Sequence, residues 1–251
     1  MEIAQRLSGH LAKIETLNLR VTNPQAQRDF YCKVLGMHDL GDGRICYNEC
    51  EAAIRFGLSK LPYVPKPDDL YWKIALSVPN INLACSQLRN LGVECSEPNQ
   101  FRDVGYLAKF LDPEGFSIEL IDHWFKGDRP NEAYDENLLG GGAHLSLVTL
   151  RTSDISSIEP DILRTGMTPL SVQPVEPFGF TLYFYGPPGE YPPDPDLTAI
   201  ENRTWTYRRP YTVLEVQHVH SGIGERVPAE NESGFQSLAI SNGVIPSLGI
   251  S

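Results

Sequence analysis

The chain has 251 residues, of which 41% are hydrophobic, so it is long enough for one large or two modest domains with a real core. Acidic residues exceed basic ones by 32 to 21, and the formal charge of −11 argues against binding to nucleic acid or to anionic membrane surfaces. No apolar run approaches the roughly 18 residues that a membrane-spanning helix needs, and the first residues lack the apolar core of a signal peptide. We therefore expect a cytoplasmic protein with neither nucleic-acid nor membrane partners.

Three segments share one order of elements: an alternating strand, a polar turn, a helix, and a glycine followed by an apolar residue. They are Thr16–Met37, Lys73–Val93 and Leu147–Met167. A polar residue that can cap the helix marks each turn, and a glycine stands where each helix should end. The turn residues are Asn23, Asn80 and Asp154, and the glycines are Gly36, Gly92 and Gly166.

Each helix is followed by stretches that alternate apolar and polar residues, so each repeat predicts a βαβββ module. In chain order the stretches are RICYN and AAIRFGL, GYLAKFL and FSIELI, and FTLYFYG and YTVLEVQ. A Pro-rich exposed loop, PPGEYPPDPDL, separates the last two, and FQSLAIS (235–241) resembles the first strand of a fourth module. The predicted class is α+β, with βαβββ modules pairing into a curved mixed sheet.

A single module has too few strands to bury both faces of its sheet, so the modules should pair. We expect modules one and two to pair as one domain over residues 10–125, followed by a linker over 126–142. Residues 143–251 then hold module three and the first strand of a truncated fourth module. Because module three lacks a complete partner in this arrangement, either that strand covers it or a second chain does, which predicts a homodimer.

The five cysteines lie in the first half of the chain and lack the C-x-x-C spacing of zinc or redox sites. They are Cys32, Cys46, Cys50, Cys85 and Cys95. Reduced structural thiols are the favoured interpretation. Cys46 and Cys50 flank a predicted turn and could face each other across a hairpin, so a redox role for that pair stays open.

Paired βαβββ modules with these motifs resemble the vicinal oxygen chelate superfamily, which includes glyoxalase I, bleomycin resistance proteins and extradiol dioxygenases. DFYCKVLGM (29–37) is similar to the family's first helix, and YLAKFLDPEGFSIEL (106–120) to its closing hairpin. FTLYFYGPPGE (180–190), NRTWTYRRPYTVLEVQH (202–218) and GFQSLAIS (234–241) resemble glyoxalase I in detail. The resemblance covers most of residues 10–241 and implies a glyoxalase-like fold with a cleft inside a curved sheet.

The resemblance also implies a divalent metal, which would be zinc, nickel, iron or manganese. The family holds it with a His or Gln near the start of each module's first strand and a Glu on each last strand. Glu119 and Glu215 keep the glutamate positions of modules two and three, but module one has Arg55 or Gly57 there. The strand-one positions hold Thr16, Lys73, Leu147 and Ser237. A cleft without any cofactor therefore stays open beside a metal-bound one.

Lys73 and His144 each admit two interpretations. An ammonium at Lys73 would occupy the place of a cation beside Glu119, which predicts an internal ion pair; the alternative is a desolvated lysine of lowered pKa that acts as a base or forms a Schiff base. His144 precedes the matched position by three residues and should face away from Glu215 in a regular strand. A β-bulge would make His144 and Glu215 two metal ligands; otherwise His144 is a surface histidine.

Two arginines and an aromatic cluster point to ligand binding. Arg20 and Arg151 match the family arginine that holds a glutathione carboxylate, and a guanidinium suits bidentate carboxylate recognition. Val219 stands where the family has a glutathione-contacting asparagine, which counts against a thiol conjugate. The cluster either lines a pocket mouth or covers the sheet as an ordinary amphipathic strand. It consists of Trp205, Tyr207, Arg208, Arg209 and Tyr211.

Three functions follow as hypotheses. The first is a glyoxalase-type lyase or isomerase, rather than a dioxygenase, acting on a small oxygenated molecule such as a glutathione hemithioacetal. Its candidate catalytic residues are Glu215, Glu119 and Lys73, with Arg20 or Arg151 on the acid group of the substrate. The second is a metal-free relative that binds or sequesters a small molecule, and the third is a dimeric structural module with vestigial sites. Fold kinship favours none of them, because function depends on the site.

Overall fold

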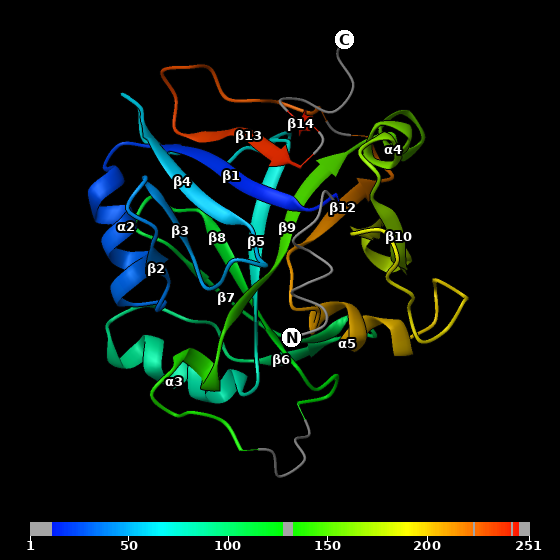
Figure 1. Ribbon diagram of the computed structural model, residues 1–251, viewed down its shortest axis with the longest axis horizontal. Helices are drawn as coiled ribbons and strands as arrows, with labels where there is room; N and C mark the ends of the chain where they lie inside the picture. Colours follow the sequence, from blue (N-terminus) through cyan, green and yellow to red (C-terminus); the bar gives the residue numbers. More distant parts are fainter. Residues whose placement is uncertain (1–11, 128–132, 223, 242, 246–251) are drawn as a thin grey trace.

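The computed structural model describes residues 12–127, 133–222, 224–241 and 243–245, with side chains up to Ser241. Module one comprises β1 (Ile14–Val21), α2 (Pro24–Lys33), β2 (His38–Asp39), β3 (Arg44–Cys46) and β4 (Ala53–Leu58). Module two comprises β5 (Tyr71–Val78), α3 (Ile81–Asn90), β6 (Asn99–Phe101), β7 (Gly105–Leu111) and β8 (Ser117–Asp122). Figure 1 shows both modules, and the α+β class of repeated βαβββ units is confirmed.

Module three begins after the short helix η1 (Leu139–Gly141) and carries more insertions than the other two. Its elements are β9 (His144–Thr152), α4 (Ile155–Arg164), β10 (Thr168–Val175), η2 (Glu176–Phe178), β11 (Phe180–Gly186), α5 (Glu201–Tyr207) and β12 (Val213–Val219). The expected strand of a fourth module is β13 (Gly234–Ile240), and β14 (Gly243–Ile245) follows it. Within the part of the chain that the structure describes, no helix is long and apolar enough to cross a membrane.

The predicted turn chemistry is confirmed in all three modules. Each polar turn residue accepts a hydrogen bond from a backbone N–H in the first turn of its helix, at 2.8–3.0 Å. The bonds reach Asn23 from Ala26, Asn80 from Leu83, and Asp154 from Ser156. The glycine after each helix has a positive φ, of 80° to 93°, which an L side chain adopts only with strain.

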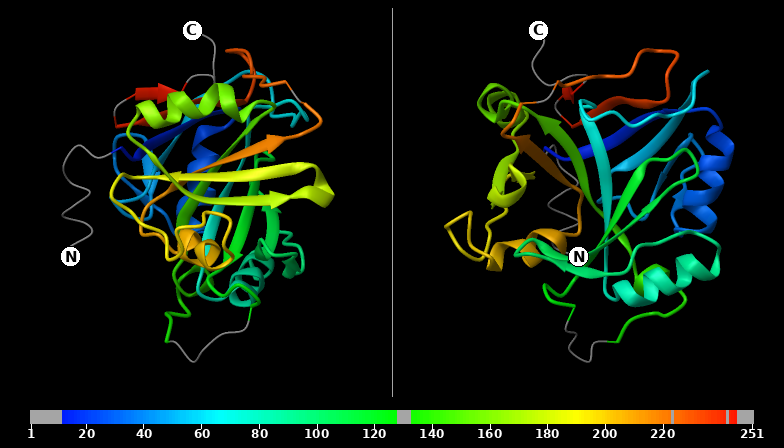
Figure 2. Two further views of the ribbon diagram at one scale, coloured as in Figure 1. Left: turned by 90° about the vertical axis from the view of Figure 1, so that its right-hand side faces the viewer. Right: turned by 180° about the vertical axis from the view of Figure 1, so that it is seen from behind.

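The strands form two sheets, and the modules pair differently from the expectation. One sheet has six strands in the order β14-β13-β1-β4-β3-β2, and the other has eight in the order β10-β11-β12-β9-β5-β8-β7-β6. The first strand of module two, β5, pairs antiparallel with β9 of module three, while β1 pairs antiparallel with β13 (Figure 2). The pairing of modules one and two within residues 10–125 is therefore wrong, because β5 places its free edge against module three. This pairing also removes the reason for expecting a second chain.

The hairpin between β7 and β8 holds the two sheets together. The Asp112 carboxylate accepts a hydrogen bond from Tyr31 Oη on α2 at 3.0 Å, and burial raises the pKa of Asp112 to about 6. Glu114 accepts hydrogen bonds from the Thr22 hydroxyl at 2.9 Å and the Ser233 hydroxyl at 2.7 Å, which belong to modules one and four. The hairpin of module two thus fastens the six-stranded sheet to the eight-stranded one.

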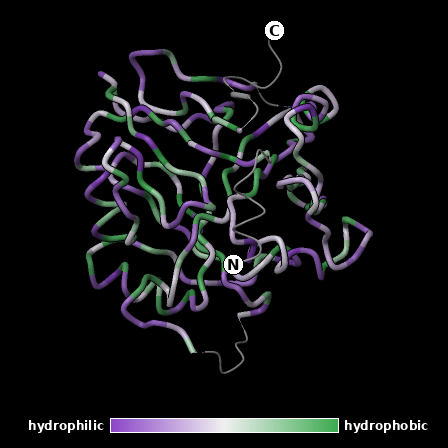
Figure 3. The backbone as a smooth tube through the Cα atoms, in the orientation of Figure 1, coloured by the Kyte–Doolittle hydropathy of each residue, from purple (hydrophilic) through white to green (hydrophobic). Residues whose placement is uncertain are grey.

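Apolar residues fill the space between the sheets and the helices. Figure 3 shows the hydrophobic segments concentrated in the central strands, with hydrophilic segments in the outer loops. One large core cluster includes buried residues of both sheets, such as Leu17, Leu76 and Leu238. A second, smaller cluster contains Leu147 and Leu182 and belongs to the eight-stranded sheet, where it forms the floor of the cavity described below.

Candidate functional site

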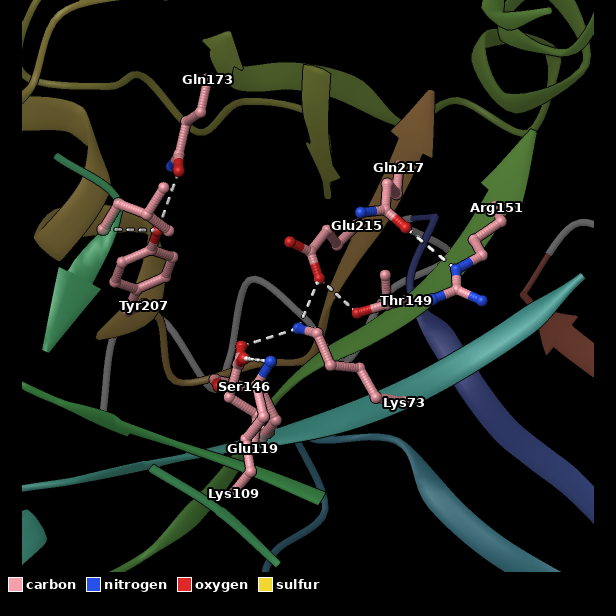
Figure 4. Close-up of polar contacts among 12 residues, drawn as sticks. Lys73, Lys109, Glu119, Ser146, Thr149, Arg151, Gln173, Tyr207, Glu215 and Gln217 are labelled. Carbon is pink, nitrogen blue, oxygen red and sulfur yellow. Dashed lines mark hydrogen bonds and ion pairs between the residues drawn. The ribbon is translucent and has the colours of Figure 1, made fainter. Parts of the chain in front are cut away.

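Lys73 forms the centre of a buried ionic cluster in the eight-stranded sheet. Its Nζ donates to Glu119 Oε1 at 2.7 Å and to Glu215 Oε2 at 3.0 Å (Figure 4). Glu119 lies on β8 of module two and Glu215 on β12 of module three, on either side of the β5–β9 pair. The three residues are 2%, 6% and 2% exposed. The two glutamates predicted as metal ligands therefore converge on one ammonium.

The protonation state of Lys73 follows from this environment. Burial disfavours the ammonium, but attraction to Glu119 and Glu215 and the hydrogen bonds to both outweigh it, so the pKa of Lys73 is raised. The expected ion pair with Glu119 is confirmed and includes a second carboxylate. The alternative of a lysine with a lowered pKa is wrong, because two acids rather than an apolar pocket surround the ammonium.

Each carboxylate has a further polar neighbour. The Thr149 hydroxyl on β9 donates to Glu215 Oε2, the oxygen that also accepts from Lys73. Lys109 on β7 lies directly across the ladder from Glu119, and its Nζ is 3.6 Å from Glu119 Oε2. The half-exposed side chain of Lys109 is the least constrained cation of the cluster.

A β-bulge brings Trp72 into the same site. In the β5–β9 ladder Tyr71 pairs with Leu150 and Lys73 with Thr149, so Trp72 has no partner. Neighbouring residues of a regular strand point to opposite faces, but the bulge lets both Trp72 and Lys73 line the cavity. Three cations lie over the Trp72 ring: Lys73 Nζ at 5.1 Å, Lys109 Nζ at 5.5 Å and Arg151 Cζ at 4.4 Å from the ring centroid.

The ionic cluster lies at the wall of a cavity of about 380 Å³. Most of the lining is apolar, and it includes Val104, Leu107, Ala108, Ile121, Leu147, Leu182, Phe101, Phe178 and Phe180. Phe101 belongs to β6, at one edge of the sheet, and Phe178 to η2, beside the opposite edge strand β10. Their ring centroids are 5.1 Å apart. The curved sheet is thus closed over the cavity by an aromatic contact between its two edges.

The segment from Trp205 to Tyr211 differs in part from the amphipathic strand that one interpretation of the sequence expected. Residues 201–207 form the helix α5, which packs beside β10, rather than a continuous strand. Tyr207 lines the cavity, and its hydroxyl lies 3.0 Å from Val104 O and from Gln173 Oε1. Arg209 stacks on Trp205 at 4.1 Å. Tyr207 therefore contributes to the cavity as the first interpretation of this cluster expected.

His144 lies apart from the ionic cluster. Its Nε2 is 3.1 Å from Tyr207 O, and its ring faces His123 with centroids 5.5 Å apart. Burial lowers the pKa of His144 to about 4, so the ring is neutral. The β5–β9 ladder does contain a second bulge, at Ser146, but His144 does not line the cavity that Glu215 lines. Among the residues that the structure describes, no three His, Cys, Asp or Glu side chains are grouped to hold a metal ion.

The other predicted positions are divided between the two sheets. Arg20 is in the six-stranded sheet, where its Nη2 donates to Pro228 O at 2.7 Å and Ala229 O at 3.0 Å. Arg151 is in the eight-stranded sheet and donates from Nε to Gln217 Oε1 at 2.9 Å while stacking on Trp72. Thr16 and Ser237 lie on β1 and β13, and Leu147 is part of the apolar cavity wall. Only Lys73, Glu119 and Glu215 of the predicted residues meet at one point.

Sequence reasoning missed Trp72, Lys109, Thr149 and the phenylalanines of the cavity. Lys109 had a usable signal, because GYLAKFL and FSIELI predict a hairpin in which a lysine and Glu119 can pair across the strands. Thr149 and the phenylalanines depend on the pairing of modules two and three. No local pattern predicts that pairing.

Residues 10–120 match the family model of the Glyoxalase/Bleomycin resistance protein/Dioxygenase superfamily. The solved structure of glyoxalase I from Zea mays has a TM-score of 0.59 at 17% identity, with 91% of this chain and 74% of that chain covered. Its V278E mutant has a TM-score of 0.61 at 18% identity, with 95% and 78% covered. A candidate dioxygenase from Bacillus subtilis reaches 0.54 at 13% identity, with 91% and 69% covered. At these identities the likeness demonstrates the fold alone. Among curated protein sequences, none matches this chain.

Proposed function

We propose that the cleft of modules two and three binds a small, largely apolar molecule without a metal ion. The observation that carries the proposal is the position of Lys73 Nζ, 2.7 Å from Glu119 and 3.0 Å from Glu215. The ammonium neutralises both glutamates that the family uses as metal ligands. A divalent ion would have to displace it and would then find two carboxylates and the Thr149 hydroxyl, fewer nitrogen, sulfur and carboxylate donors than catalytic metal sites usually offer. The residues present therefore do not fit a metal.

The lining of the cavity indicates the kind of ligand. Its volume of about 380 Å³ lies near the small end of ligand pockets, which run from about 300 to 1,000 Å³. Two acids and two lysines line it, so their formal charges cancel, and most other lining residues are aliphatic or aromatic. Lys109, whose ammonium is 3.6 Å from the nearest carboxylate oxygen, is the cation most available to a ligand. The site suits a flat apolar molecule with one acidic or hydrogen-bond-accepting group.

A glyoxalase-type reaction fits the same geometry less well. Such a reaction needs a carboxylate that is free to move a proton. Glu215 Oε2 already accepts from Lys73 and from the Thr149 hydroxyl, and Glu119 lies between Lys73 and Lys109. A base at either position would first have to leave a buried ion pair, which is costly. Both walls of the cleft come from one chain, so binding requires no second subunit.

Metal analysis of the purified protein, together with a binding titration, tests the proposal. We expect no stoichiometric zinc, nickel, iron or manganese, and we expect the aromatic sulfonate 8-anilinonaphthalene-1-sulfonate to bind equally well with and without EDTA. A stoichiometric ion that disappears in Glu215→Ala would contradict the proposal and support the enzyme. The variant Phe178→Ala should weaken probe binding about fivefold, since an aromatic contact contributes about 1 kcal/mol. Leu138→Ala, which removes an exposed apolar side chain elsewhere, is the matched control.

Replacement of Lys73 by glutamine provides a converse test. Glutamine is a residue that the family uses at this position, and the change frees both carboxylates. We expect Lys73→Gln to bind Zn²⁺ or Ni²⁺ in isothermal titration calorimetry, whereas the wild type does not. Thr16→Gln, at the corresponding position of the six-stranded sheet, is the control that should gain no metal. Equal metal binding by the wild type and Lys73→Gln would show that the ammonium does not exclude the ion.

A further inference from the structure

Two cysteines that the proposed function does not use lie in contact with each other. All five cysteines are free thiols. Cys85 is on α3 and buried, and Cys95 is half-buried in the segment between α3 and β6. Their sulfur atoms are 3.0 Å apart, about 1 Å more than the length of an S–S bond. Small side-chain rotations would therefore suffice to join them.

One thiol of the pair is accessible and the other is not. Cys95 lines an open surface groove together with Arg89, Lys109 and Phe110, whereas Cys85 is 1% exposed. Arg89 Nη2 donates to the backbone oxygen of Cys95 at 3.0 Å, which places the guanidinium near the thiol, and the same Nη2 pairs with Glu97 at 2.7 Å. This arrangement suits a peripheral thiol that reacts first and an inner thiol that resolves the product.

The electrostatics of the pair agree with this division. The hydrogen bond with the Cys85 thiol lowers the pKa of Cys95, and Arg89 adds to the effect against the opposing effects of burial and of Glu97. The same hydrogen bond, followed by burial, raises the pKa of Cys85. The thiolate therefore forms at Cys95, and thiolates rather than thiols are the nucleophiles.

We propose that Cys85 and Cys95 are a redox-active thiol pair that closes to a disulfide when a peroxide reaches the groove. The Cys95 thiolate attacks one peroxide oxygen and breaks the O–O bond, which gives a sulfenic acid and a hydroxide that takes up a proton. The Cys85 sulfur then attacks the sulfenic sulfur and expels its hydroxide, while the Cys85 proton completes a second water. Two thiols and one hydrogen peroxide thus become one disulfide and two waters, and the two electrons pass from sulfur to peroxide.

The bond would form next to the wall of the cleft. Ser96 follows Cys95 directly; its N–H donates to Lys109 O and its hydroxyl accepts from Lys109 N, each at 2.9 Å. Both Ser96 and Lys109 line the cavity. The disulfide would tie α3 to the segment that supports this wall. The thiol pair itself stands on its own geometry and does not depend on what the cleft binds.

Oxidation of the full chain with hydrogen peroxide, followed by alkylation and mass spectrometry, tests the proposal. We expect the reduced protein to lose about 2 Da, the two thiol hydrogens, and N-ethylmaleimide in denaturant then to label three of the five cysteines instead of all five. Peptide mapping should find Cys85 joined to Cys95. A disulfide mapped elsewhere, such as Cys46 to Cys50, or five labelled cysteines after oxidation, would overturn the proposal. Mapping of the wild type needs no variant and therefore does not depend on the folding of one.

Three variants separate the roles of the two thiols. Cys85→Ser should stop at the sulfenic acid, which dimedone traps at Cys95, and Cys95→Ser should form neither product. Cys32→Ser, which removes a half-buried thiol on α2, is the matched control and should oxidise like the wild type. A Cys95→Ser protein that loses the same mass as the wild type would contradict the assignment.

Discussion

The same module positions hold residues of different charge in the two sheets. In the eight-stranded sheet Ala75 pairs with Glu119, and in the six-stranded sheet Asn18 pairs with Arg55, two residues after Lys73 and Thr16 respectively. The position of a buried acid in one sheet is thus that of an exposed arginine in the other, and the register decides in favour of Arg55 over Gly57. The strand-one positions Thr16 and Ser237 are neutral. The eight-stranded sheet holds two acids, which the Lys73 ammonium neutralises. The six-stranded sheet has Arg55 at the position of the acid.

The comparison shows two arrangements at the same module positions. Thr16 and Arg55 give the six-stranded sheet an ordinary polar face. In the eight-stranded sheet a lysine between two acids gives a buried site that holds its own cation. The cavity is compatible with this cluster, because its charges are paired and apolar walls surround them.

Removal of the Lys73 ammonium should cause the largest loss in the free energy of unfolding. Lys73→Met leaves the buried Glu215 without a cation and Glu119 with only the half-exposed Lys109, and breaking a buried pair in this way costs about 3–5 kcal/mol. Urea denaturation at pH 7 measures the loss.

Thr16→Val is the matched control for Lys73→Met in the six-stranded sheet. It removes only a hydroxyl from a buried position and should change the free energy of unfolding by less than about 1 kcal/mol. Similar losses for the two variants would mean that the sheets do not differ in the way described.

The next largest effect on stability should come from Glu51, which connects the two sheets. This buried carboxylate in the loop between β3 and β4 accepts the Leu145 N–H at the start of β9 at 2.8 Å, and burial raises the pKa of Glu51 to about 7. An acid whose folded pKa lies above its unfolded value of 4.5 releases its proton more readily when unfolded. The contribution of Glu51 to stability is therefore highest below about pH 4.5 and falls by up to about 3 kcal/mol as the pH rises through 7.

The variant Glu51→Gln should flatten this pH dependence. Urea midpoints measured from pH 5 to pH 8 provide the comparison, and the smaller shift of the same sign from Asp112 should remain. Glu49→Gln, at an exposed position in the same loop, should leave the pH dependence as in the wild type. An unchanged slope in Glu51→Gln would show that this carboxylate does not titrate between the sheets.

The sequence predicts the parts of this molecule that depend on local rules. The caps at Asn23, Asn80 and Asp154 follow from residues a few positions apart, and so does the Lys73–Glu119 pair once each module is aligned. The pairing of β5 with β9 is different, because every module has the same first strand and no local signal states which two strands share an edge. The second carboxylate of the cluster, Glu215, could not be placed beside Lys73 for that reason. The helix α5 was missed because its residues also fit an alternating strand.

The smallest effect should come from removing the side chain of Lys109, which lies at the solvent-exposed side of the ionic cluster. Its side chain is half-exposed, so solvent and salt screen its charge and its removal should barely change stability. It remains the most available cation for an anionic ligand, and Lys109→Ala should weaken binding of the anilinonaphthalene sulfonate about threefold at low salt. The difference should vanish at high ionic strength, because the Debye length shortens to about 3 Å at 1 M salt. Lys33→Ala, which removes an exposed lysine from α2, should bind the probe like the wild type at every salt concentration. A salt-independent loss in Lys109→Ala would instead assign this side chain a packing role against Trp72.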